Sequence, residues 1–271
     1  MKSLRSSWPS LRWRIISAER LFLFLDYDGT LAPIADHPSK ARLPAETRRL
    51  LKQLTHRPGV CTALVSGRSL TDLKQMVKLP GLLYIGNHGL EIQGPKSRYV
   101  HPGARISRPF LKEIAQVLRK SLRSIPGAWV EDKGFILSVH YRSVAPAQVS
   151  LVRNILHEVV EPYLKKSQVR ITAGKRVFEV RPALRWAKGA AIHWLLARCL
   201  AATGGKGVLP IYMGDDQTDE DAFRILRNRG ITVAVQSSLR SSQARYAVSS
   251  PKGVQQFLQR LLSIRKLSST T

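Results

Sequence analysis

Short apolar runs alternate along the chain with segments in which apolar residues recur at helical spacing. The runs cover residues 21–25, 60–65, 82–85, 208–213 and 231–235. The helical patterns cover residues 44–56, 70–78, 188–202 and 219–228, and a last amphipathic helix is expected up to about residue 262. Strands and helices that alternate in this way are typical of βαβ units. The pattern therefore predicts an α/β fold with a parallel-sheet core.

The rhythm changes between residues 102 and 182. Here the pattern predicts helices over 109–124 and 146–164 and strands over 128–132, 135–141, 169–171 and 176–180. We interpret this αββαββ unit as an inserted cap domain whose sheet is at least partly antiparallel and which can move relative to the core. The predicted organisation is an N-terminal extension at 1–20, a discontinuous core at 21–101 and 183–265, and a cap at 102–182.

The formal net charge of +26 over 271 residues indicates an anionic partner. Basic residues are spread along the chain, without a Lys/Arg block, a Cys/His finger or an aromatic RNA-binding motif. We therefore expect a basic surface that attracts an anionic substrate and binds polyanions weakly, with no specific nucleic-acid site. Seven of the eighteen acidic residues fall in two short segments: Asp26, Asp28, Asp215, Asp216, Asp219, Glu220 and Asp221. Such concentration in a basic chain predicts a cation site.

The lengths of the apolar stretches and the spacing of the cysteines bear on the cellular compartment of the protein. No apolar stretch is long enough to cross a bilayer, so no membrane insertion is expected. Cys61 and Cys199 lie far apart without CxxC spacing, which favours a reducing cytoplasm. Charges interrupt the apolar residues of 1–20, which argues against a secretory signal. We favour a short disordered extension over an organelle transit segment.

The stretch LFLFLDYDGT at 21–30 ends an apolar run in two aspartates one residue apart. The run suits a strand buried on both faces, and such sheets keep their chemistry at the carboxyl ends of their strands. Asp26 and Asp28 can then converge on one cation, beside the turn that Gly29 allows. A plain strand followed by an Asp/Gly turn explains the same residues.

Four segments together resemble the haloacid dehalogenase superfamily of phosphotransferases. They are DYDGT at 26–30, VSGR at 65–68, Lys188 in WAKGAA, and GDDQTDEDAF at 214–223, in the order that the superfamily requires. Each motif is weak to moderate alone, and chance agreement of all four is improbable. The resemblance implies a haloacid dehalogenase-like Rossmannoid core that catalyses phosphoryl transfer.

The resemblance implies separate roles for the residues of these motifs. Asp26 would attack phosphorus to form an aspartyl-phosphate, and Asp28 would move protons to the leaving oxygen and from water. Ser66 and Lys188 would hold the phosphoryl oxygens, with help from Thr30. Mg²⁺ is the expected cofactor, held by Asp26, the backbone carbonyl of Asp28, Asp215 and, directly or through water, Asp219. Asp216 is assigned a structural or ligand-orienting role.

Ordinary structural roles also fit several of these residues. Ser66 with Gly67 could form a turn after a strand, and a lone lysine such as Lys188 is most often solvated. Thr218 and Asp221 fit a capping box at a helix start. Capping leaves the remaining acids of the cluster unexplained.

Further segments are similar to the trehalose-6-phosphate phosphatase family, over about residues 21–262. They are GNHGLEI at 86–92, VEDKGFILSVHYR at 130–142, GKRVFEVRP at 174–182, KGAAI at 188–192 and SPKGVQQFL at 250–258. The similarity implies hydrolysis of trehalose 6-phosphate to trehalose and phosphate, the last step of trehalose biosynthesis. It implies sugar recognition by Lys133, His140, Lys175 and Glu179 of the cap and by Arg68, Asn87 and His88 of the core.

This family membership carries expectations about partners. We expect a monomer that receives trehalose 6-phosphate from a separate synthase, because no glucosyltransferase segment precedes residue 21. Two alternatives stay open. One is a related phosphatase acting on sucrose phosphate or mannosylglycerate phosphate. The other is a basic polyanion-binding protein on the same scaffold.

Overall fold

A computed structural model of the chain describes residues 1–35, 37–95, 97–174, 176–202, 204, 207–236 and 241–267, with only the backbone at 265–267. The chain forms two compact units. The core unit comprises Met1–Tyr99 and Trp186–Thr271, and the cap unit comprises Val100–Arg185. The prediction of an α/β fold with a parallel-sheet core and an inserted αββαββ unit is confirmed.

The described residues of the core unit build a nine-stranded sheet in the order β1-β13-β12-β11-β2-β3-β4-β5-β6. From one edge to the other, the strands are β1 (Lys2–Ser3), β13 (Tyr246–Val248), β12 (Ile231–Val235), β11 (Val208–Gly214), β2 (Arg20–Asp26), β3 (Val60–Val65), β4 (Leu83–Gly86), β5 (Glu91–Gln93) and β6 (Arg98–Val100). Neighbouring strands from β1 to β4 are parallel, and β5 is antiparallel to β4. β2 therefore lies inside the parallel part of the sheet.

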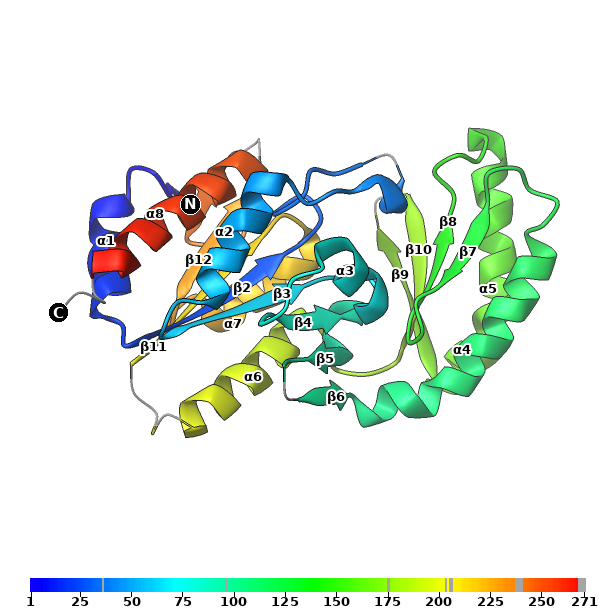
Figure 1. The fold of residues 1–271 in the computed structure, drawn as a ribbon. Helices are drawn as coiled ribbons and strands as arrows, with labels where there is room; N and C mark the ends of the chain where they lie inside the picture. Colours follow the sequence, from blue (N-terminus) through cyan, green and yellow to red (C-terminus); the bar gives the residue numbers. More distant parts are fainter. Residues whose placement is uncertain are drawn as a thin grey trace. The chain divides into compact units, whose positions relative to one another are not determined.

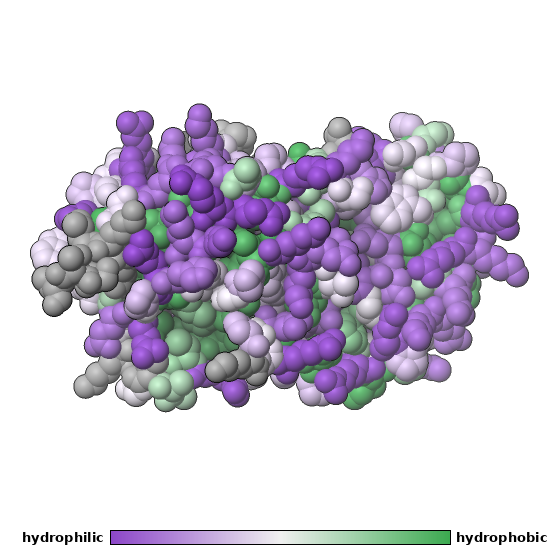
Figure 2. Space-filling view, viewed as in Figure 1, coloured by the Kyte–Doolittle hydropathy of each residue, from purple (hydrophilic) through white to green (hydrophobic). Residues whose placement is uncertain are grey.

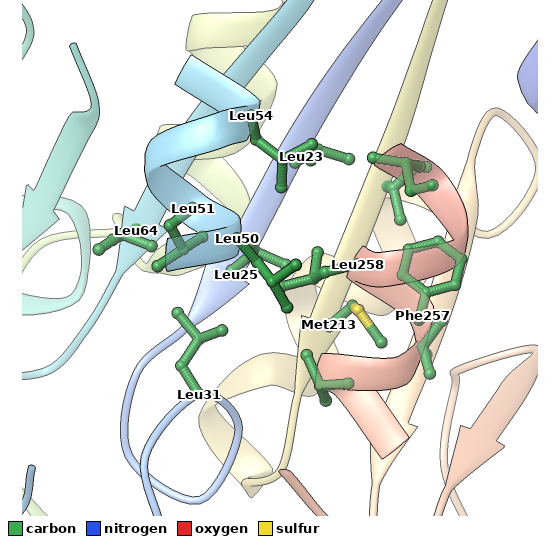
Figure 3. Packing of buried hydrophobic residues seen from close by; sticks show 14 of the residues in the cluster. Leu23, Leu25, Leu31, Leu50, Leu51, Leu54, Leu64, Met213, Phe257 and Leu258 are labelled. Atoms are coloured by element: carbon green, nitrogen blue, oxygen red, sulfur yellow. The ribbon is translucent and has the colours of Figure 1, made fainter. Parts of the chain in front are cut away.

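Helices cover both faces of this sheet (Figure 1). One layer contains α1 (Trp8–Ser17), α2 (Ala45–Thr55), α3 (Leu70–Val77) and α8 (Pro251–Leu267), and the other contains α6 (Lys188–Ala202) and α7 (Glu220–Leu226). Successive residues of β2 alternate between the two layers. Leu23 and Leu25 pack with α2 and α8, as Figure 3 shows, whereas Phe24 packs with α6 and α7. This burial on both faces explains the unbroken apolar run before Asp26.

The cap unit is an antiparallel sheet with two helices on one face. The strand order is β7 (Trp129–Asp132), β8 (Leu137–His140), β10 (Val177–Pro182) and β9 (Val169–Gly174). α4 (Pro102–Ser121) and α5 (Val149–Lys165) pack on alternate strand residues such as Val139 and Val180. Glu179 and Ser138 pair with each other and are the chain neighbours of Val180 and Val139, so their side chains point to the opposite face of the sheet. That face of the cap sheet is polar.

Two differences from the predicted elements concern whole turns of structure. The helix expected over 109–124 begins at Pro102, and Pro109 lies within it. Proline favours the first turn of a helix, where Pro102 lies. His101 caps the start of the helix, because its Nδ1 accepts from the Gly103 N–H. The second difference concerns residues 1–20.

The disordered extension expected at 1–20 is instead part of the core unit. β1 adds to the sheet edge through Lys2, which pairs with Tyr246. α1 buries Leu11 and Ile15 against the core, and Trp8 packs edge-on against Phe257 of α8. The apolar residues of 1–20 recur at helical spacing, and burying them outweighs the repulsion among the interspersed arginines.

The chain leaves and re-enters the core unit at two aromatic residues. The rings of Tyr99 and Trp186 lie 6.3 Å apart, and the Trp186 Nε1–H donates to the Gly89 carbonyl at 2.9 Å. Tyr99 also stacks on Trp194 of α6 at 4.6 Å. Both ends of the insertion are thus fixed to the core unit.

The surface is largely hydrophilic, as the basic composition suggests. Hydrophilic side chains are spread over the visible face in Figure 2, with hydrophobic patches between them. Among the described residues, no helix is both long enough and apolar enough to cross a bilayer.

Candidate active site

Three adjacent parallel strands end at one edge of the core sheet. β2 ends at Asp26, which lies beside Val65 of β3, and Met213 of β11 lies beside Leu25. The residues that follow these ends are therefore neighbours. This register brings together Asp26, Ser66 and Asp215, which lie far apart in the sequence.

A buried lysine bridges two carboxylates at this edge. The Lys188 Nζ lies 2.6 Å from Asp26 Oδ1 and 2.7 Å from Asp219 Oδ1. The side chains of Lys188, Asp26 and Asp219 are 3%, 6% and 0% exposed. Burial by itself lowers the pKa of Lys188. The carboxylates of Asp219 and Asp26 raise it by more than burial lowers it, so the pKa lies above its usual range. Lys188 is therefore a charged ammonium ion, and the prediction of a solvated lysine is excluded.

A third carboxylate joins this pair. Carboxylate oxygens of Asp26, Asp215 and Asp219 lie within 4.8 Å of one another. Burial raises the pKa of Asp26 well above its usual range, Lys188 lowers it in part, and Asp219 and Asp215 raise it again. Lys188 pairs with two of these three carboxylates, those of Asp26 and Asp219.

The donor set fits a hard divalent cation. Mg²⁺ takes oxygen ligands, and here the oxygens of three carboxylates converge. Space for this convergence depends on Gly29, whose φ is +79°. A Cβ at Gly29 would overlap the carboxylate of Asp215. Asp26, Asp215 and Asp219 could therefore hold the cation.

Asp219 is fixed on both of its carboxylate oxygens. Its Oδ1 accepts from the Tyr212 hydroxyl at 2.6 Å, and its Oδ2 accepts from the Asp216 N–H at 2.9 Å. Asp216 in turn caps the 3₁₀ turn Gln217–Asp219, so the capping box consists of Asp216 and Asp219. Asp219 therefore holds Lys188 in a rigid frame.

The predicted capping box of Thr218 and Asp221 is wrong. Asp221 instead accepts from the Gly189 N–H at 2.9 Å and from the Ala222 N–H at 2.8 Å. A short 3₁₀ turn precedes α7, which moves the cap two residues toward the N-terminus. Asp221 thereby ties α7 to the first turn of α6, next to Lys188.

Asp28 is paired with Arg68. The Arg68 Nε–H and Nη2–H donate to the two carboxylate oxygens of Asp28, each at 2.7 Å. Arg68 also donates to Asp72 at 3.0 Å and to the Pro38 carbonyl at 2.9 Å. Arg68 was predicted from the family resemblance to contact the sugar, and Asp72 was not predicted at all, although it lies four residues on along the same helix start.

Two hydroxyl groups lie buried at the same edge of the sheet. Ser66 is 1% exposed, and its Oγ accepts from the Arg68 N–H at 3.1 Å, which leaves its own O–H to donate. Thr30 is fully buried, and its hydroxyl makes no hydrogen bond to the part of the chain that the structure describes. Hydroxyl groups in this state suit an oxyanion ligand.

The loop after β4 is a tight turn held by the Ser66–Arg68 segment. Asn87, His88 and Gly89 all have positive φ, at 49°, 54° and 101°. The Asn87 N–H donates to the Arg68 carbonyl at 2.7 Å, and the His88 N–H donates to the Ser66 carbonyl at 3.0 Å. Such strained backbone persists where its surroundings fix it and is common at functional sites.

A buried glutamate, absent from the predicted site, supports this turn. Glu91 is 8% exposed and accepts from Asn87 Nδ2 at 2.7 Å and from the Leu70 N–H at 3.4 Å. The sequence signal was present in the segment GNHGLEI, where an acid follows an apolar residue on a short strand. Asn87 and Glu91 thus form one hydrogen-bonded unit.

Glu179 of the cap unit lies between two cations. The Lys133 Nζ lies 3.1 Å from Glu179 Oε1, and the Arg181 Nε–H donates to Oε2 at 2.9 Å. The Ser138 hydroxyl donates to Oε1 at 3.3 Å. These residues share the polar face of the cap sheet.

His140 lies on the same face. Its ring stacks on Trp129 with centroids 3.9 Å apart, and its Nε2 lies 2.8 Å from Glu131 Oε2. Aromatic side chains with a few polar groups beside them are typical of surfaces that bind organic ligands. The remaining predicted cap residue, Lys175, lies outside the described residues.

The trehalose-phosphatase family model matches residues 24–253. The chain belongs to the trehalose-phosphatase family. The probable trehalose-phosphate phosphatase D of Arabidopsis thaliana is 38% identical over 261 residues, covering 92% of this chain and 69% of that protein. The probable trehalose-phosphate phosphatase C of the same plant is 35% identical over 281 residues, covering 97% and 86%. The family resemblance inferred from the motifs is confirmed.

Solved structures agree with this trehalose-phosphatase assignment at the level of the fold. The C-terminal domain of C. albicans trehalose-6-phosphate phosphatase matches with a TM-score of 0.79 at 23% identity, covering 97% of this chain and 98% of that one. The family match spans both units, since residues 24–253 include the whole cap.

Within each unit, the predicted site residues that the structure describes lie together. The core unit brings together Asp26, Asp28, Thr30, Ser66, Arg68, Asn87, His88, Lys188, Asp215 and Asp219 at the carboxyl edge of its sheet. The cap unit places Lys133, His140 and Glu179 on one sheet face. Tyr212 and Asp72 were missed because their roles depend on contacts between segments.

Proposed function

We propose that this trehalose-phosphatase hydrolyses trehalose 6-phosphate to trehalose and inorganic phosphate, with Mg²⁺ as cofactor. The observation that carries the proposal is the buried cluster of Asp26, Lys188 and Asp219 beside Asp215, at the open end of β2. The sugar specificity follows the names of the relatives, which are 35–38% identical over most of the chain. Identity over 92% and 97% of this chain favours trehalose 6-phosphate over the substrates of the related sugar phosphatases.

In the first step, a carboxylate oxygen of Asp26 forms a bond to phosphorus while the bond from phosphorus to the sugar oxygen breaks. The leaving oxygen takes the proton of Asp28, which becomes a carboxylate. The products of this step are trehalose and an aspartyl-phosphate at residue 26. Asp28 suits the role because its side chain is 39% exposed and follows the nucleophile by two residues.

In the second step, water attacks phosphorus and gives a proton to Asp28. The bond between phosphorus and Asp26 breaks, which restores the Asp26 carboxylate and releases phosphate. Protonated Asp28 is then ready for another turnover. Each turnover thus consumes one water molecule and leaves the enzyme unchanged.

The other residues of the edge bind the phosphoryl group. Lys188 carries a fixed positive charge against Asp26, and it can also contact a phosphoryl oxygen. The Ser66 and Thr30 hydroxyls offer donors that the described chain leaves available. Bound at Asp26, Asp215 and Asp219, Mg²⁺ would offset the repulsion between these carboxylates and the phosphate dianion.

The cap unit would recognise the sugar. Glu179, Lys133, Arg181 and His140 supply acceptors and donors that pair with hydroxyl groups, and Trp129 supplies an apolar ring. The basic composition favours capture of an anionic ester from solution. We also propose that the enzyme is cytoplasmic and monomeric and that a separate synthase supplies its substrate.

A panel of sugar phosphates tests the proposal. Phosphate release is measured from trehalose 6-phosphate, sucrose 6-phosphate, mannosylglycerate phosphate and glucose 6-phosphate, with Mg²⁺ and with EDTA. We expect trehalose 6-phosphate to give a kcat/KM at least about 100-fold above the others, and chelation to remove it. Equal turnover of another ester, or activity that survives EDTA, contradicts the proposal.

A further inference from the structure

Strands β9 and β10 of the cap sheet place two arginines opposite each other. Arg170 pairs in register with Arg181. Both side chains point to the polar face of the sheet, because their chain neighbours Ile171 and Val180 pack toward the helices. The Cβ atoms of directly opposite residues lie about 4.5–5.5 Å apart, and like charges at such positions destabilise a sheet. The polar face of the cap sheet therefore contains a repulsive pair.

Of these two arginines, only Arg181 has a carboxylate partner among the described residues. The Arg181 Nε–H donates to Glu179 Oε2 at 2.9 Å, and the same carboxylate pairs with Lys133 at 3.1 Å. The Nε–H of Arg170 is buried and has no acceptor in the described part of the chain. Burial and the charge of Arg181 both lower the pKa of Arg170, and no described carboxylate raises it. Since an arginine stays protonated, Arg170 is a cation without a described carboxylate partner.

A hydroxyl group beside Arg170 also lacks a described partner. Thr172 lies two positions along β9, on the same face of the sheet, and pairs in register with Glu179. Its Oγ1 is buried and makes no hydrogen bond to the described residues. Because buried polar atoms are nearly always hydrogen-bonded, two unpaired groups on one strand face indicate a place where a ligand accepts hydrogen bonds.

Charge decides which acceptor fits. A water molecule or a sugar hydroxyl can accept hydrogen bonds from Arg170 and Thr172, but neither reduces the repulsion between the two guanidinium groups. A phosphate group does both, because guanidinium groups bind phosphate oxygens through paired N–H donors. The long side chain of Arg170 can change rotamer, so that its Nε–H turns toward such a ligand.

We infer that Arg170, Thr172 and Arg181 form an oxyanion site on the polar face of the cap sheet, with a phosphate group as ligand. Free phosphate and a phosphate ester both carry this group. All three residues belong to the cap unit, whereas the catalytic residues belong to the core unit. The inference goes beyond the proposed function, because binding at this site requires neither Mg²⁺ nor turnover.

The test titrates the full chain with inorganic phosphate in EDTA at constant ionic strength. In NMR spectra of the arginine Nε–H groups, the signal that Arg170→Gln removes should shift in the wild type. The phosphate concentration for half-maximal thermal stabilisation should rise about tenfold in Arg170→Gln and about threefold in Thr172→Val. Arg123→Gln removes an exposed arginine of the same unit and should leave phosphate binding unchanged.

The melting temperature gives a second readout. Without phosphate, Arg170→Gln should be at least as stable as the wild type, because it removes the like-charge pair. With phosphate, the melting temperature of the wild type should increase more than that of Arg170→Gln, since only the wild type has the complete site. Arg170→Lys keeps the charge but loses the paired donors, so its affinity should lie between those of the wild type and Arg170→Gln.

Titrations with trehalose and with trehalose 6-phosphate, also in EDTA, identify the ligand. A shift of the Arg170 signal with either phosphate compound supports the site, and the tighter of the two names the source of the phosphate group. A shift with trehalose alone would overturn the inference. Equal phosphate affinity of the wild type and Arg170→Gln, or equal destabilisation of Arg170→Gln with and without phosphate, would also overturn it. Failure of the proposed function is a separate result, namely no Mg²⁺-dependent phosphate release by the wild type.

Discussion

The core unit and the cap unit hold charged clusters of opposite composition. In the core unit, the single ammonium ion of Lys188 serves Asp26 and Asp219, and all three side chains are at most 6% exposed. In the cap unit, the single carboxylate of Glu179 serves Lys133 and Arg181, with side chains 11% to 12% exposed. In these ion pairs, two carboxylates meet one cation in the core unit, whereas two cations meet one carboxylate in the cap unit.

This difference indicates what each cluster can do. Excess carboxylate in a buried site favours a divalent cation, and through it a phosphoryl group. The ion-paired side chains on the polar face of the cap sheet contain hydrogen-bond donors and acceptors. These groups can bind sugar hydroxyls in place of one another. The core cluster should therefore control the chemical step, and the cap cluster should control recognition.

Asp26→Asn should have the largest effect. An amide cannot attack phosphorus effectively, so kcat should fall by at least about 10³-fold. The folded state should be as stable as the wild type or more stable, because one of three crowded carboxylates is neutralised. Phosphate release and thermal unfolding measure both effects. A variant with substantial turnover would remove the core cluster from the chemical step.

Removal of divalent ions should come next. Chelation should reduce turnover by at least about 100-fold, and added Mg²⁺ should restore it. Mg²⁺ should also raise the melting temperature of the wild type, whereas Asp215→Asn should reduce this shift. Equal stabilisation of both proteins would show that the ion binds elsewhere.

Lys188→Met should lower kcat by about 10² to 10³-fold and destabilise the fold. It leaves Asp26 and Asp219 buried without their ammonium partner, which costs about 3–5 kcal/mol of unfolding free energy. Mg²⁺ should recover part of this loss. Chemical denaturation with and without Mg²⁺ is the measurement, and an exposed lysine such as Lys112 provides the matched control. A fully stable Lys188→Met protein would contradict the description of the cluster.

The metal-free protein should also respond to pH through Asp26. Burial raises the pKa of Asp26, so the folded state binds this proton more tightly than the unfolded chain, whose pKa is about 3.9. Stability contributed by this group is therefore full below about pH 4 and falls as pH rises toward the folded pKa. The free energy of unfolding of the wild type should therefore fall relative to that of Asp26→Asn as the pH rises over that range, as measured by denaturation curves. A constant difference would argue against the raised pKa.

Glu179→Gln should have the smallest effect on activity. We expect KM for trehalose 6-phosphate to rise about tenfold with a smaller change in kcat, since only uniform binding is lost. Turnover of p-nitrophenyl phosphate, which carries no sugar, should be unaffected. Loss of activity on both substrates would mean that the cap cluster also supports the chemical step.

The core site could be predicted from the sequence because its parts follow strand ends. An apolar run that ends in Asp26, and a second that ends before Asp215, are visible as local patterns. Parallel pairing then brings the two ends together without any further information. Lys188 could be added because it opens a helix in a motif of the superfamily.

Roles that depend on contacts between segments could not be predicted in this way. The donors of Arg68 reach Asp28, Asp72 and Pro38 on three different segments, and no local pattern indicates these pairings. The capping box was shifted from its predicted place because a 3₁₀ turn precedes α7, and local patterns rarely separate such a turn from the helix that follows.

The aromatic contact between Tyr99 and Trp186 has a consequence for the ancestry and engineering of the chain. An insertion whose flanking residues Tyr99 and Trp186 bring their rings within 6.3 Å of each other behaves like a domain placed in a surface loop. The core unit can close without it, at little cost in loop entropy. Cap domains of other specificities could therefore be exchanged between these two aromatic residues, with the phosphoryl-transfer machinery inherited intact.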